Sequence, residues 1–217
     1  MTTGMTIIIA DDHPLFRGAL RQALLAMHDE PAVVEAGDFE AARSAAARHQ
    51  NADLMLLDLT MPGGSGLSGL IMLRAEYPSL PVVIVSASDD AATVRRALDL
   101  GASGFISKSA SIDEIRKGIA AVLDGNIYTP VGYERGTEQD AEIGDLINRL
   151  RTLTPQQSRV LSMVGEGLLN KQIAYELGVS EATVKAHVSA ILLKLNVDSR
   201  TQAVIQLGKI GATSAVV

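Results

Sequence analysis

The residues best suited to chemistry are polar side chains that each follow a short apolar run. Asp11 and Asp12 follow the first such run, Asp58 the second, Ser86 the third and Lys108 the fourth. Short, continuous apolar runs are typical of parallel strands that are covered on both faces. In doubly wound sheets, ligands and reacting groups lie at the carboxyl ends of the strands. We therefore expect these five side chains to meet at one edge of a sheet.

Three carboxylates at neighbouring strand ends repel one another, so a cation is expected among them. Mg²⁺ prefers oxygen ligands and typically takes one or two carboxylates together with waters and a phosphate. Taken alone, Asp11 and Asp12 could instead complement the dipole of a following helix, and Asp58 could cap a loop. Their combination with Ser86 and Lys108 favours a metal site that carries out chemistry at Asp58.

The pattern around these residues predicts five successive β-α units. Right-handed crossovers then give a parallel sheet with helices on both faces, and the order 2-1-3-4-5 brings the first and third strands together. The fold class is therefore α/β, followed by a small all-α domain. We expect strands at residues 5–10, 33–34, 53–58, 81–86 and 104–106, and helices at 14–27, 39–49, 66–77, 89–100 and 111–125.

The second part of the chain has no strand pattern. Pro130, Gly132, Gly136 and an acidic run mark residues 126–148 as a linker whose later part has a helical pattern. Beyond it, a short helix, a glycine turn at Gly178 and a longer Ser-capped helix predict a helix-turn-helix. The first expected helix begins at residue 154 and ends near Gly165 or Gly167, and the others cover residues 170–177, 180–195 and 199–207. The expected domains are 1–125 and 149–217.

Composition narrows the class of protein. The chain has 217 residues, 47% of them hydrophobic, which indicates a globular protein with ample core. It has no Cys, which excludes disulfides and thiol chemistry and fits the cytoplasm. Residues 1–148 carry 11 Lys and Arg against 21 Asp and Glu, whereas residues 149–217 carry 8 against 4. An acidic part joined to a basic part predicts a separate partner for each.

Residues 5–125 resemble the CheY-like receiver domain of two-component response regulators. The resemblance is carried by the Asp11-Asp12 pair, Asp58, Ser86 and Lys108, in order and each at a strand end. It implies that Asp58 accepts a phosphoryl group from a sensor histidine kinase. It also implies an Mg²⁺ ion held by Asp12, Asp58 and the backbone carbonyl of Thr60, with Asp11 acting through water. Ser86 and Phe105 would be the switch residues.

Residues 154–208 resemble the LuxR-type helix-turn-helix of the NarL/FixJ subfamily. The matching segments are L-T-P at 153–155, N-K-Q-I-A at 170–174, T-V-K-A-H-V at 183–188 and K-L-N-V-D-S-R at 194–200. The resemblance places the third helix of this domain in the major groove of DNA and makes the fourth helix a dimerising element. The DNA-contact candidates are Lys171, Thr183, Lys185, Ala186, His187, Ser189, Lys194 and Arg200.

Two positions depart from this subfamily. Ser189 stands where many relatives carry Lys or Arg, and Leu193 stands where a basic residue is frequent. Both changes weaken the electrostatic attraction to DNA, which makes dimerisation more necessary. Leu193 is expected to pack on a neighbouring helix or on a partner subunit.

Two other classes of function are compatible with parts of the sequence. Gly64, Gly66 and Gly69 fit the G-x-G-x-x-G pattern of a dinucleotide-binding loop, with Asp89 twenty residues beyond. That pattern is disfavoured because Asp58 lies between strand and loop, and its charge would repel a pyrophosphate. The other class is a DNA-binding regulator whose receiver is an unphosphorylated dimerisation scaffold. His13 is expected to be an ordinary loop residue beside Asp12.

The sequence therefore predicts a phosphorylation-controlled transcriptional regulator and not an enzyme. Its expected partners are a histidine kinase, promoter DNA and a second copy of the chain, with no membrane. Our hypothesis is that the unphosphorylated receiver covers the recognition helix, and that phosphorylation of Asp58 releases or dimerises the DNA-binding domain.

Overall fold

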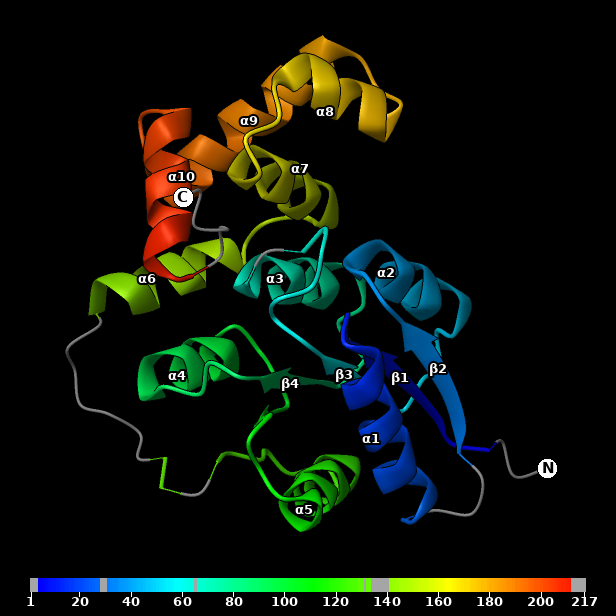
Figure 1. The fold of residues 1–217 in the computed structure, drawn as a ribbon. Coiled ribbons are helices and arrows are strands. Elements are labelled where there is room, and N and C mark those ends of the chain that lie inside the picture. The colour runs from blue at the N-terminus through cyan, green and yellow to red at the C-terminus, as the bar shows by residue number, and fades with distance from the viewer. Residues whose placement is uncertain (1–3, 28–30, 65, 131, 134–140, 212–217) are drawn as a thin grey trace. The chain divides into compact units, whose positions relative to one another are not determined.

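The computed structural model describes residues 4–27, 31–64, 66–130, 132–133 and 141–211 (Figure 1). The chain divides into two compact units, residues 1–64 with 77–136 and residues 65–76 with 137–217. Among the described residues, no helix has both the length and the apolar character needed to cross a membrane.

The first unit is built on a five-stranded sheet in which all neighbouring strands are parallel. Its strands are β1 (Thr6–Ala10), β2 (Ala32–Ala36), β3 (Leu54–Leu57), β4 (Val82–Ser86) and β5 (Gly104–Ser107). Their order is β2-β1-β3-β4-β5, which confirms the predicted topology. The second strand is longer than predicted because Ala32, Glu35 and Ala36 also pair with β1.

The register of the strands sets the position of the polar residues. Ala10 pairs with Leu57, so Asp11 and Asp58 leave the sheet side by side, and the Asp58 amide donates to the Ala10 carbonyl at 2.9 Å. On the other side, the Lys108 amide donates to the Ser86 carbonyl at 2.8 Å. The side chains expected to meet therefore do share one edge.

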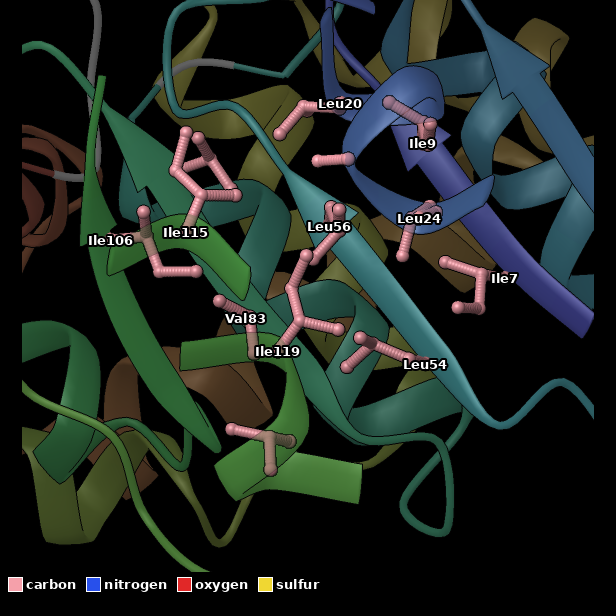
Figure 2. Close-up of a cluster of buried hydrophobic side chains, with 13 residues drawn as sticks. Ile7, Ile9, Leu20, Leu24, Leu54, Leu56, Val83, Ile106, Ile115 and Ile119 are labelled. Atoms are coloured by element: carbon pink, nitrogen blue, oxygen red, sulfur yellow. The ribbon is translucent and has the colours of Figure 1, made fainter. Parts of the chain in front are cut away.

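Helices cover both faces of this sheet. They are α1 (Pro14–Leu25), α2 (Phe39–Arg48), α4 (Ala91–Asp99) and α5 (Ile112–Leu123), with α1 and α5 on one face and α2 and α4 on the other (Figure 1). Figure 2 shows the core between the sheet and the α1–α5 pair, where Leu20, Leu24, Ile115 and Ile119 meet the alternate residues of β1 and β3. The next residue along β1, Ile8, is also fully buried, as expected for a strand covered on both sides.

Local signals fix the helix ends. Ser111 and Glu114 form the predicted capping box at the start of α5. Helix α4 begins two residues later than predicted because Asp90 is its N-cap and accepts from the Thr93 amide at 3.0 Å. Hydrogen bonds from Thr93 also lower the pKa of Asp90. The helix is followed by Gly101 at φ 95°, a conformation that favours glycine.

The segment after α5 returns to the sheet and runs along the outer edge of β5. Tyr128 forms a parallel bridge with Gly104, and its carbonyl accepts from the Phe105 amide at 2.9 Å. Its ring lies over Gly118, where an added Cβ would come within 2.9 Å of the ring. This glycine is therefore needed for the close approach of Tyr128 to α5.

The second unit is all-helical. Its helices are α3 (Leu67–Glu76), α6 (Ala141–Leu150), α7 (Pro155–Gly165), α8 (Asn170–Leu177), α9 (Glu181–Leu195) and α10 (Arg200–Lys209). Gly178 at φ 63° makes the turn between α8 and α9, and the Ser180 hydroxyl caps α9. These features confirm the predicted helix-turn-helix. Helix α6 begins in the later part of the predicted linker, where the sequence has a helical pattern.

Helix α3 is apolar around much of its circumference, with Leu67, Leu70, Met72 and Leu73 all buried. Such a helix needs cover on more than one side. It packs against α7, where Arg159 Nε lies 3.5 Å from Glu76 Oε1.

We predict that Gly118→Ala lowers the stability of the receiver by about 1–3 kcal/mol, because the new methyl group clashes with Tyr128 and Ile106. Hydrogen exchange of peptides from α5 and β5 would measure this change. Gly18→Ala is the matched control, because Gly18 lies in a helix with open space around it and should gain up to about 1 kcal/mol. Combining Gly118→Ala with Tyr128→Ala should recover part of the lost stability. If Gly118→Ala lowered stability equally with and without Tyr128, the explanation would be contradicted.

Candidate functional site

The centre of the site is an ion-paired lysine between two buried carboxylates. Lys108 Nζ lies 2.8 Å from Asp58 Oδ2 and 2.7 Å from Asp11 Oδ2. Asp58 is 3% exposed and Asp11 is 1% exposed. Strand β5 delivers the lysine, whereas β1 and β3 deliver the carboxylates. Asp58 is therefore a buried carboxylate whose charge is balanced by a cation on one side.

The surroundings keep Lys108 charged. Burial acts to lower its pKa, but the hydrogen bonds and charges of Asp11 and Asp58 outweigh burial, so the pKa of Lys108 is raised. The ring of Phe16 lies beneath the ammonium group, with 5.0 Å between Nζ and the ring centroid. This cation–π contact was not foreseen from the sequence. Its only sequence signal is an aromatic residue one turn into α1.

The other predicted residues follow or belong to β3, β4 and β5, and of these Thr60 contacts Asp58. The Thr60 hydroxyl lies 2.9 Å from Asp58 Oδ2, and the Thr60 amide donates to Oδ1 at 3.2 Å. Ser86 is completely buried, and its hydroxyl oxygen accepts from the Ser88 amide at 3.1 Å. Phe105 is also completely buried in β5.

Asp12 and His13 form the solvent side of the site. His13 Nδ1 lies 2.7 Å from Asp12 Oδ1 and 3.3 Å from Asp11 Oδ1. The His13 amide also donates to Asp11 Oδ1 at 2.7 Å. His13 was expected to be an ordinary loop residue beside Asp12. It does lie beside Asp12, but its ring also turns toward both carboxylates, which the sequence did not predict. Histidine next to an Asp pair at a strand end was the signal available.

The residues present fit a divalent cation. Asp11, Asp12, His13 and Asp58 each offer one ligand atom, and these atoms all lie within 4.8 Å of one another. Asp11 Oδ2 and Asp12 Oδ1 are buried oxygens whose near neighbours are Lys108 Nζ and His13 Nδ1, each at 2.7 Å. Three carboxylates and one ammonium leave a formal charge of −2, which one divalent ion neutralises. Oxygen-rich sites of this kind suit Mg²⁺.

The second unit presents one face of α9 to solvent. Ala182, Lys185, Ala186 and Ser189 are exposed on this helix. Its opposite side carries the buried Val184, Ile191 and Leu195, with Val188 and Leu192 half-buried. The exposed face matches the one expected to enter the major groove. Lys185 Nζ lies 3.1 Å from Glu181 Oε1, one turn earlier, and is itself exposed.

The other DNA-contact candidates divide into two groups. Lys171 and Thr183 are exposed and His187 is half-buried. Lys194 and Arg200 instead hold groups within the unit. Lys194 Nζ donates to the Thr152 carbonyl at 2.7 Å and to Gln157 Oε1 at 2.8 Å.

Arg200 joins α10 to the start of α8. It donates to the Leu168 carbonyl and, at 3.2 Å, to Asn170 Oδ1. Burial lowers the pKa of its guanidinium group. These contacts hold the start of α8 against α10.

The glycine pattern at 64–69 has a structural explanation. A Cβ on Gly64 would lie 2.6 Å from the Phe39 ring, so glycine is needed there for packing. Ser65 lies outside the described residues. The ring leaves no room for a phosphate against this glycine, which opposes the dinucleotide-binding interpretation.

Family models match both parts of the chain. Residues 7–120 match the response regulator receiver domain, and residues 151–207 match the bacterial regulatory proteins of the luxR family. The glycerol metabolism activator of Pseudomonas putida is 45% identical over 214 residues, which cover 96% of this chain and 97% of that protein. The nitrate/nitrite response regulator NarL of Escherichia coli K12 is 33% identical, over 92% of this chain and 93% of its own.

Solved structures of similar proteins include RcsB bound to DNA. RcsB from Salmonella enterica serovar Typhimurium, bound to a promoter in the presence of phosphomimetic BeF₃⁻, is 27% identical with a TM-score of 0.54. The alignment covers 96% of this chain and all of that chain. A structure of two RcsB dimers on two parallel DNAs gives 26% identity and a TM-score of 0.56, with 96% of this chain and all of that chain covered.

We predict that Arg200→Leu weakens the helix-turn-helix unit by about 1–3 kcal/mol, because two acceptors lose their charged donor. Hydrogen exchange of peptides from α8 and α10 would detect the loss. Lys171→Leu is the matched control because Lys171 is exposed on α8, and its effect should stay within about 0.5 kcal/mol. Equal effects of the two substitutions would show that Arg200 does not join these helices.

Proposed function

This chain belongs to the DNA-binding response regulators that join a receiver to a LuxR-type helix-turn-helix, and from that premise we propose that phosphorylation of Asp58 controls its binding to promoters. One observation carries the proposal. Asp58 is a buried carboxylate with a lysine ammonium group at 2.8 Å and two further carboxylates beside it. A structural capping residue would gain nothing from this repulsive arrangement. The family is one of regulators and not of enzymes.

The proposed reaction moves a phosphoryl group from a histidine of a sensor kinase to Asp58. An Asp58 carboxylate oxygen attacks the phosphorus, a P–O bond forms, and the P–N bond to the kinase histidine breaks, with its electron pair left on that histidine. Such transfers need an in-line nucleophile and neutralisation of charge on the phosphoryl oxygens. Lys108 Nζ already lies 2.8 Å from Asp58 Oδ2. After the transfer it can pair with the negative charge of the phosphoryl oxygens on Asp58.

The proposed metal ligands are Asp12, Asp58 and the Thr60 carbonyl, with Asp11 acting through water. Bound Mg²⁺ would supply positive charge to the phosphoryl oxygens. Two other side chains act on these groups directly. Asp11 pairs with Lys108 and keeps it charged, and the Thr60 hydroxyl is hydrogen-bonded to the Asp58 carboxylate before a phosphodonor binds.

Ser86 and Phe105 are the proposed switch residues. Ser86 ends β4, and in its present position its oxygen accepts from the Ser88 amide. To donate its hydroxyl to a phosphoryl group, Ser86 would have to move toward Asp58. Phe105 is fully buried here. We propose that the Phe105 side chain changes its rotamer when Ser86 moves. Its buried position here would then belong to one of the two states of the receiver.

The DNA-binding surface we propose is the exposed face of α9, with Lys185 as its principal contact to a base or phosphate. Lys171, Thr183 and His187 are proposed phosphate contacts. Ala186 and Ser189 complete the groove-facing surface. Lys194 and Arg200, also candidates, are proposed to act mainly by holding α9 and α10 in place. RcsB binds DNA as dimers in one of the similar structures, which supports binding as a dimer here.

Helix α10 is the proposed dimer element, through the side that faces away from its own core. Ala203 and Leu207 are buried within the unit, whereas Ile205 is 57% exposed. Leu193 on α9 is 82% exposed, so it does not pack on a neighbouring helix of the described chain. Of the two roles expected for Leu193, contact with a partner subunit is the one we propose.

Control of DNA binding requires two states of different stability. We propose that the unphosphorylated receiver covers the recognition helix, and that phosphorylation favours a state that releases or dimerises the second domain. Allosteric couplings of this kind are typically about 1–3 kcal/mol. A sensor histidine kinase and promoter DNA are the partners that this scheme needs, and it places the protein in the cytoplasm.

We predict that wild-type protein gains one phosphoryl group when incubated with a small phosphodonor and Mg²⁺, whereas Asp58→Asn gains none. Intact mass measurement would show the adduct, and a known receiver labelled in parallel is the control. Absence of the adduct from both proteins would favour the scaffold alternative. If Asp58→Asn and wild type bound the cognate promoter equally under phosphorylating conditions, the proposed coupling would be disproved.

We predict that Lys185→Ala weakens promoter binding and, if Lys185 contacts a phosphate, reduces the salt dependence of binding by about one unit of slope. A base contact would instead relax specificity at one position, at a cost of about 1–3 kcal/mol. Fluorescence anisotropy at several salt concentrations would separate these outcomes. Lys117→Ala removes the same charge from the exposed side of α5 and should leave DNA affinity unchanged.

A further inference from the structure

His13 places a ring nitrogen beside a cluster of carboxylates that otherwise offers only oxygen atoms. Its ring is 64% exposed, yet Nδ1 is turned inward and lies 2.7 Å from Asp12 Oδ1. An exposed imidazole is free to adopt other rotamers at little cost. The ring therefore lies next to the place that an ion bound by Asp11, Asp12 and Asp58 would take. The phosphoryl transfer proposed above assigns no role to this side chain.

The geometry allows one ion to bind all of these groups. Two ligands of one metal, each at about 2.1 Å, lie roughly 3 to 4.2 Å apart. The ligand atoms of Asp11, Asp12, His13 and Asp58 already fall within 4.8 Å of one another. Small side-chain movements bring all of these separations into that range, including an opening of the 2.7 Å contact between His13 Nδ1 and Asp12 Oδ1. His13 is on the solvent side, where such movement is least restricted.

Ligand chemistry then decides which ions benefit. Carboxylates and carbonyls suit Mg²⁺, whereas imidazole suits ions such as Zn²⁺, Ni²⁺ and Fe²⁺, and site affinity rises from Mn²⁺ through Co²⁺ to Ni²⁺. A neutral imidazole adds a donor atom without adding charge. It therefore strengthens the binding of a transition ion much more than it strengthens the binding of Mg²⁺.

We propose that His13 is a metal ligand and makes the acidic site of this receiver a binding site for first-row transition ions of the Co²⁺ to Zn²⁺ class. The inference rests on the proposed function only in that both use the same carboxylates. In this scheme Asp12 and His13 hold the ion at the mouth of the site, and Asp58 completes its coordination. The ion in the site then depends on which divalent metals are available.

Isothermal titration of untagged full-length protein with Co²⁺ alone and with Mg²⁺ alone tests the inference. We expect wild type to bind Co²⁺ more tightly than Mg²⁺. We expect His13→Asn to lose about tenfold or more in Co²⁺ affinity, since loss of even a group that only orients a metal ligand costs about 10–100-fold, while its Mg²⁺ affinity changes less than about twofold. The visible absorption of bound Co²⁺ should also shift when its nitrogen ligand is removed.

His49→Asn is the matched control because His49 is exposed at the end of α2, away from the acidic residues, and should change neither affinity. Equal losses for Co²⁺ and Mg²⁺ in His13→Asn, or no loss for either, would overturn the inference. The two proposals can fail separately. Phosphorylation with Mg²⁺ but no His13-dependent Co²⁺ binding would refute only this inference, and the reverse result would refute only the proposed function.

Discussion

The pairing of Lys108 with Asp11 and Asp58 is the interaction on which the receiver depends. Taking each of these charges out of water costs several kcal/mol, and only close pairing offsets that cost. Three different strands must therefore end at one place and in one register. The ammonium lies within 2.8 Å of both carboxylates, and Phe16 closes the space beneath it. A shift of one strand by a single residue would leave a buried charge without its partner.

That constraint also separates the apolar core of the receiver from its charged edge. The apolar core between the sheet and α1 and α5 is fully buried and holds the strands in register. The polar edge has only one cation for three carboxylates, so it stays short of positive charge. A divalent ion can bind at this edge, and Lys108 can form a new contact there, without a change in the core. The apolar core and the charged edge thus occupy different parts of the same strands.

The second unit uses its cations in two ways. Lys185 is exposed on α9, whereas Lys194 and Arg200 donate to carbonyl groups inside the unit. Lys194 holds α9 at the Thr152 carbonyl, and Arg200 holds α10 at the start of α8. The basic charge of residues 149–217 therefore overstates the number of cations that are free to meet phosphate.

Sequence patterns alone determined the strand order, the five polar residues at the sheet edge, the capping box of α5 and the helix-turn-helix. These features depend on local periodicity and on caps and turns, which short stretches of sequence encode. Tertiary structure alone decided the orientation of His13, the contact of Phe16 with Lys108, the return of Tyr128 to β5 and the internal roles of Lys194 and Arg200. Each of these joins residues that local patterns do not link or orient, and packing decides which groups a long or rotatable side chain can reach.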